Sequence, residues 1–168
     1  CMEAWRDERW AAALEHHDGL FAAVQQLVAA RPAEAPGLWG NYGEALAQFT
    51  APMQIQFAEI RAMIFDSAAR TEGVGALAEC LKWGQPAYLT EASRSGSTIR
   101  LGALKSVPEN CAVFFNCQTT LVEGFRTQFG DVFAFEGNRA LILPQDAFPR
   151  DALALCLQAA LTYHRRKR

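Results

Sequence analysis

Cationic and aromatic side chains recur at the ends of apolar segments in this 168-residue sequence. A pocket with aromatic walls and several guanidinium or ammonium donors suits a small anion or a carboxylate-bearing ligand. Arg100, which lies on one of these segments, belongs to the same polar group. From this pattern we predict a binding site for a small anionic molecule, formed by Lys82, Trp83, Pro86, Tyr88, Lys105, Arg126, Glu136 and Arg139.

Each of these residues also has a purely structural interpretation. Glu136, Arg126 and Arg139 would then be ion pairs around a turn, and Trp83 would belong to the core. The two interpretations differ in where Trp83 points. Toward Arg126 and Arg139 it would form the wall of a binding site, and toward Phe115 it would be core. The sequence leaves both open.

Recognised catalytic patterns are absent from the sequence. There is no G-x-S-x-G motif for a nucleophilic serine, and Gly73-Val74-Gly75 lacks the third glycine of a dinucleotide-binding loop. His16 and His17 are neighbours, and neighbours on a helix point about 100° apart, so they do not converge on one metal ion. We therefore predict no catalytic residue and no metal site. A binding domain is favoured over an enzyme, and an enzymatic role stays open.

The overall charge and the cysteines narrow the class of protein. A formal net charge of -2 gives no general attraction to nucleic acid or to an anionic membrane. Glu3, Asp7 and Glu8 occupy the place where a signal peptide needs a positive region. The five cysteines include no C-x-x-C pair, which is typical of a reducing compartment. These features predict a cytoplasmic protein that binds neither nucleic acid nor a membrane.

Helical patterns dominate the first half of the chain. A helix is expected over residues 3–30, and its apolar stripe could also pair with a second copy to form a homodimer. Further helices are expected over residues 44–49 and from the capping Thr50 to Ala69, followed by a short helical turn over residues 76–81. The stripe of the first helix consists of Trp10, Leu14, His17, Phe21, Val24 and Val28.

Strand patterns begin after residue 90. Residues 99–103 alternate between apolar and polar side chains, as a half-buried strand does. Residues 107–110 predict a turn. Residues 111–117 are apolar on both faces, which predicts a central strand with Cys111 and Cys117 packed in the core.

A helix, a hairpin and a final helix complete the chain. The first helix is expected over residues 121–129. Gly137-Asn138 suits a two-residue primed turn between two strands, so Glu136 would pair with Arg139 and Ala134 with Leu141. The last helix is expected to begin near Pro149, with a buried stripe of Leu153, Cys156, Leu157, Ala160 and Leu161.

Together these elements predict an α+β fold. An antiparallel sheet of about five strands would pack against helices. Residues 1–50 would form an N-terminal helical extension, and residues 51–168 would form the α+β domain.

The string Cys80-Leu81-Lys82-Trp83-Gly84-Gln85-Pro86-Ala87-Tyr88, with its W-G-x-P-x-Y core, resembles the YdhG-like family of uncharacterised bacterial domains. The likeness extends over about residues 52–165 and includes Phe125-Arg126 and Glu136-Gly137-Asn138-Arg139-Ala140. It implies a small α+β domain with an antiparallel sheet and, as for some members of the family, a frataxin-like role as an intracellular iron chaperone. Iron is implied by this resemblance alone, because the acidic residues form no run that would offer a hard cation its oxygen ligands.

Overall fold

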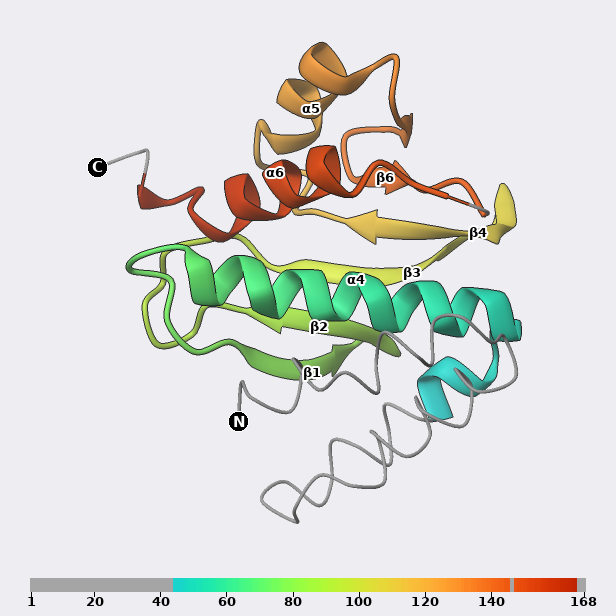
Figure 1. Ribbon diagram of the computed structural model, residues 1–168, viewed down its shortest axis with the longest axis horizontal. Coiled ribbons are helices and arrows are strands. Elements are labelled where there is room, and N and C mark those ends of the chain that lie inside the picture. Colours follow the sequence, from blue (N-terminus) through green and yellow to red (C-terminus); the bar gives the residue numbers. More distant parts are fainter. Residues whose placement is uncertain (1–43, 146, 166–168) are drawn as a thin grey trace.

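The computed structural model describes residues 44–145 and 147–165 (Figure 1). The predicted first helix over residues 3–30, its homodimer stripe and the His16-His17 pair lie outside the described residues. Residues 44–47 are helical, within the short helix predicted there. The remaining elements, in chain order, are α4 (Ala51–Arg70), β1 (Ala78–Lys82), β2 (Gln85–Leu89), β3 (Ile99–Leu104), β4 (Val107–Phe114), α5 (Leu121–Phe129), β5 (Ala134–Glu136), β6 (Ala140–Ile142) and α6 (Arg150–Leu161).

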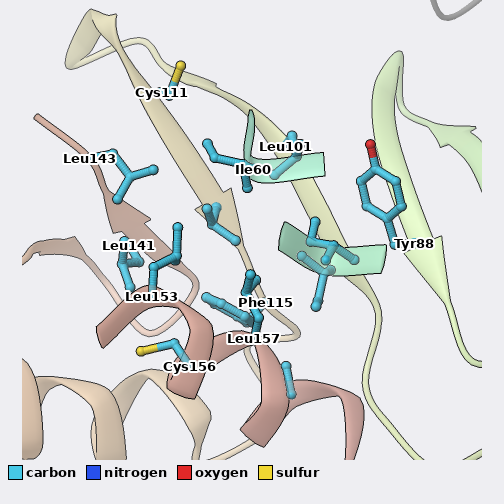
Figure 2. Packing of buried hydrophobic residues seen from close by; sticks show 14 of the residues in the cluster. Ile60, Tyr88, Leu101, Cys111, Phe115, Leu141, Leu143, Leu153, Cys156 and Leu157 are labelled. Carbon is cyan, nitrogen blue, oxygen red and sulfur yellow. The ribbon is translucent and has the colours of Figure 1, made fainter. Parts of the chain in front are cut away.

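The strands form a single antiparallel sheet in the order β1-β2-β3-β4-β6-β5. The predicted α+β class is confirmed, with six strands in place of about five. The helices α4 and α6 run side by side over one face of this sheet (Figure 1). Leu153 and Leu157 of α6 point toward Phe115, which directly follows β4, and Leu141 of β6 (Figure 2), so this face holds the main hydrophobic core.

The helices begin and end close to where the sequence predicts. A proline in the first turn of α4 suits the free end of a helix, because proline has no N–H to leave unsatisfied. After α4, Gly73 adopts a left-handed φ of 75°, which turns the chain back toward the sheet. The predicted stripe of α6 is buried residue for residue. Apolar residues that recur over three or four helical turns predict a helix from its own sequence, and the tertiary packing buries the same residues.

The second face of the sheet carries a smaller apolar cluster. Cross-strand partners share a face, so Arg100, Phe114 and Ala140 lie on this side. Among the described residues, the buried members of the cluster are Leu104, Ala112, Phe114 and Ala140, and all four come from strands. The buried side chains of the described helices belong to the core on the other face.

The helical turn predicted over residues 76–81 is wrong because pairing between strands overrides local preference. The expected helical turn over residues 76–81 is strand β1, although its sequence AECLK consists largely of helix formers. All five of its residues pair with β2, from Ala78 with Leu89 to Lys82 with Gln85. Helix propensity amounts to only a few tenths of a kcal/mol per residue, so a paired strand edge decides the outcome.

The turn predicted over residues 107–110 is the beginning of strand β4. The register jumps between Ala103, which pairs with Cys111, and Leu104, which pairs with Val107. The extra residues on β4 form an irregularity that accommodates Pro108, which has no N–H for a regular ladder. At its other end β4 stops at Phe114. Cys111 is buried in the core as predicted, whereas Cys117 lies beyond the strand and is exposed.

The register predicted for the last hairpin is shifted by one residue. Glu136 pairs with Ala140, Phe135 with Leu141 and Ala134 with Ile142, so the loop contains Gly137, Asn138 and Arg139. A two-residue type I′ turn needs a positive φ at both central residues. Gly137 has a φ of 55°, but Asn138 is not among the residues with positive φ. The shift places Phe135 beside Leu141 on the face that packs against the helices.

Candidate functional site

Trp83 occupies the tight turn between β1 and β2. It has a φ of 53° and the following Gly84 has a φ of 72°, so both central residues of the turn are left-handed. Such turns favour asparagine or glycine, and another L-residue in this conformation costs about 1–2 kcal/mol. Trp83 is nevertheless 83% exposed. Trp83 is therefore not a core residue, and the turn projects it from the sheet.

Arg100 supports this indole from strand β3. Its guanidinium carbon lies 4.5 Å from the centre of the Trp83 ring and 5.5 Å from the centre of the Phe114 ring. Its Nη1 also donates a hydrogen bond of 2.9 Å to Oε1 of Gln85. A Cβ on Gly102 would lie 2.7 Å from Nε2 of Gln85 and 3.2 Å from the Phe114 ring. The missing side chain at Gly102 thus makes room for the groups that hold Arg100 in place.

Arg139 brings a second guanidinium near the first. It lies in the β5–β6 loop, where its carbonyl accepts a hydrogen bond of 2.8 Å from the backbone N–H of Phe115. Burial lowers the pKa of Arg100, and the positive charge of Arg139 lowers it further. We call Trp83, Arg100 and Arg139 the arginine–indole site.

One carboxylate balances part of this positive charge. Glu136 accepts a hydrogen bond of 2.5 Å from the hydroxyl of Ser106 and one of 3.1 Å from Nη2 of Arg139. These two bonds hold the pKa of the Glu136 carboxyl below its ordinary value, with Ser106 the larger cause. Within residues 44–145 and 147–165, Arg100 forms no ion pair with a carboxylate. The site therefore has an excess of positive charge, which is concentrated on a guanidinium that is only partly hydrated.

The role of Ser106 can be tested through the titration of Glu136. Ser106→Ala is expected to raise the pKa of Glu136 toward its ordinary value, because the carboxylate loses a hydrogen bond that only its charged form accepts fully. A carboxyl whose pKa is lowered by folding stabilises the protein at neutral pH, and this contribution is lost as the pH falls through that lowered pKa. NMR titration of the Glu136 side-chain carboxyl measures the shift.

Ser93→Ala is the matched control for this titration, because it removes a hydroxyl that bonds to Ser95. The Glu136 pKa should be the same in this variant as in the parent protein. An unchanged pKa in Ser106→Ala would mean that the Ser106 hydroxyl does not stabilise the carboxylate.

The other predicted site residues lie elsewhere. Tyr88 is fully buried on the helix-covered face, with its ring 5.8 Å from that of Phe65, and Pro86 is buried on the same strand. Arg126 reaches the carbonyl of Gly137, and its guanidinium lies over the Phe135 ring. It therefore stabilises the conformation of the β5–β6 loop.

The two predicted lysines lie at strand ends. Lys82 is half-buried and pairs with Gln85 directly before the Trp83 turn, on the side of the sheet that carries Arg100. Lys105 is exposed in the turn between β3 and β4. The structure thus brings Trp83 and Arg139 together through Arg100, with Glu136 beside Arg139 and Lys82 next along the chain. Tyr88 and Pro86 belong to the core.

Arg100 is central to the site, although the sequence pattern that predicts the site does not single it out from the other charged residues. One signal in the sequence does separate it from its neighbours. In the alternating segment from Ile99 to Ala103, it is the one charged residue on the face opposite Ile99 and Leu101. Phe114 and Gln85 share that face, but only the strand order reveals this, because three different strands contribute them.

Two other kinds of function find no support in the described part of the chain. No group of three or more histidine, cysteine, aspartate or glutamate side chains there could hold a metal ion. Among the same residues, no helix combines the length and the apolar character needed to cross a membrane.

Comparison with known proteins identified no relative of this chain. No family model, no curated protein and no solved structure matches the chain.

Proposed function

We propose that this chain is a non-enzymatic domain that binds a small anion at the arginine–indole site. The observation that carries the proposal is the environment of Arg100. Its guanidinium carbon lies 4.5 and 5.5 Å from the centres of two aromatic rings, the charge of a second arginine acts on it, and no carboxylate of the described residues pairs with it. Bringing two like charges together costs free energy that an anion between them would recover.

The shape of the guanidinium favours particular anions. One edge of Arg100 is occupied by Gln85. Its remaining N–H groups keep the planar fork that matches the two oxygens of a carboxylate or a phosphate. The aromatic rings hold this fork in one orientation, so less conformational entropy is lost when an anion binds.

Inorganic phosphate is a suitable first probe, and Arg100→Gln is the decisive variant. We expect phosphate at low ionic strength to perturb the NMR signals of the Trp83 indole N–H and of the backbone around Arg100 and Arg139 in a saturable way. Arg100→Gln should weaken this binding about tenfold, because a charge-assisted hydrogen bond is lost.

Arg70→Gln is the control with the same change in net charge. Arg70 is exposed on α4 and pairs only with the nearby Asp66 among the described residues. If Arg100→Gln and Arg70→Gln weaken phosphate binding equally, the effect comes from overall charge and the proposed site is wrong.

The resemblance to the YdhG-like family supports a second candidate, iron delivery. Saturable binding of ferrous iron under anaerobic conditions, unaffected by Arg100→Gln, would favour that function over anion binding.

A further inference from the structure

We infer that the anion bound at the arginine–indole site carries a planar unsaturated ring, which stacks on the exposed face of Trp83. This inference rests on the proposed function and specifies the chemical class of the ligand. An aryl phosphate, an aryl carboxylate and a mononucleotide share this chemistry, since each joins a flat ring to an anionic group.

The first argument is the conformation of Trp83. Its turn would form at lower cost with asparagine or glycine, which accept a left-handed φ readily. A large apolar ring in this position is strained and exposed at the same time. Three large hydrophobic residues of the described chain are exposed, and Trp83 is the aromatic one among them. Strain at a surface position points to a role for the side chain in binding.

The second argument is that Arg100 occupies only one side of the indole. The guanidinium lies 4.5 Å from the ring centre, and the Trp83 residue is still 83% exposed. Arg100 is itself held by Phe114 and Gln85, so the indole rests on a fixed support. A flat ring could therefore stack on the remaining side of an indole that is already oriented.

The third argument is the position of the positive charge relative to this surface. Arg100 lies under the indole, and Arg139 is close enough to lower the pKa of Arg100. A ligand ring stacked on the other side of Trp83 would bring its anionic group to the two guanidinium groups when that group extends past the edge of the indole. An anion without a ring would bind to the arginines alone, and the indole would stay exposed to water. This difference makes the inference separable from anion binding itself.

The experiment compares methyl phosphate with phenyl phosphate, which carry the same anionic group with and without a ring. The full chain contains four tryptophans, and incorporation of 5-fluorotryptophan gives each a separate ¹⁹F signal. The signal that disappears in Trp83→Asn identifies Trp83. We expect phenyl phosphate to bind about tenfold more tightly than methyl phosphate, with the Trp83 signal shifting most.

Trp83→Asn is also the test variant, because asparagine suits the turn and the side chain that it replaces is exposed. This variant should fold at least as stably as the parent protein in thermal unfolding. Followed by backbone NMR, it should bind methyl phosphate and phenyl phosphate with equal affinity. Trp83→Phe should retain part of the preference for phenyl phosphate.

The outcomes separate the two claims. Equal affinities of the parent protein for methyl phosphate and phenyl phosphate would overturn the ring inference and leave anion binding intact. No saturable binding of either would overturn the proposed function as well. Adenosine monophosphate distinguishes the sources of the ring: tighter binding than phenyl phosphate indicates a nucleotide, and weaker binding indicates a simple aryl acid.

Discussion

Replacing Arg61 with methionine is expected to lower the free energy of unfolding by about 3–5 kcal/mol, because it leaves the carboxylate of Glu79 without its buried partner. Nε and Nη2 of Arg61 donate hydrogen bonds of 2.6 and 2.7 Å to the two carboxylate oxygens of Glu79. The Arg61 side chain is 5% exposed and that of Glu79 is 14% exposed. This ion pair ties α4 to the edge strand β1, which precedes the Trp83 turn.

Urea denaturation of matched variants tests this expectation. Arg70→Met removes the same type of side chain from an exposed ion pair on the same helix, and it should cost less than about 1 kcal/mol. The double variant Arg61→Met with Glu79→Leu should recover most of the lost stability, since no uncompensated charge then remains buried. If Arg61→Met costs no more than Arg70→Met, the carboxylate of Glu79 is hydrated and the ion pair does not anchor β1.

Gly96→Ala is expected to destabilise the protein by about 3 kcal/mol, because the new methyl group would collide with backbone atoms. A Cβ at this position would lie 2.4 Å from the carbonyl carbon and oxygen of Leu161 and 2.5 Å from the carbonyl oxygen of Ala160. These atoms form the C-terminal end of α6 and cannot rotate away as a side chain can.

The loop around Gly96 also provides hydrogen-bond partners for backbone groups at the C-terminal end of α6. The N–H of Ser97 donates a hydrogen bond of 2.8 Å to Ala160, the hydroxyl of Ser95 donates one of 2.8 Å to Leu161, and the carbonyl of Ser95 accepts one of 2.9 Å from His164. The last carbonyls of a helix lack partners within the helix, so these bonds matter for stability. Displacement of the loop in Gly96→Ala would weaken them together.

Gly124→Ala is the control for the effect of a methyl group on glycine. Gly124 lies within α5, and apart from the backbone of its own helix and its chain neighbours no atom lies within 4 Å of a Cβ built there. Alanine forms helices better than glycine, so this variant should gain about 0.5–1 kcal/mol. Guanidinium denaturation measures both variants. Equal stability of Gly96→Ala and the parent protein would mean that the loop moves away from α6 without cost.

The sequence and the tertiary structure contribute differently to the candidate site. The sequence points to Trp83, Glu136 and Arg139 through residue type and position at segment ends. It also places Tyr88 beside Trp83, and the fold separates them because Tyr88 faces Phe65 in the core while the Trp83 indole lies over Arg100. Which face of a strand meets the helices depends on the register with its neighbours, and a shift of one residue reverses it.

The sequence by itself determined the helices α4, α5 and α6, the alternation along β3 and the α+β class. Each depends on periodicity within one segment, so the signal lies in neighbouring residues. Only the tertiary structure decided that residues 78–82 form an edge strand, that the last hairpin has a three-residue loop, and that Arg100 joins Trp83 to Arg139. These features arise from pairing between segments far apart in the chain, where packing and register outweigh local propensity.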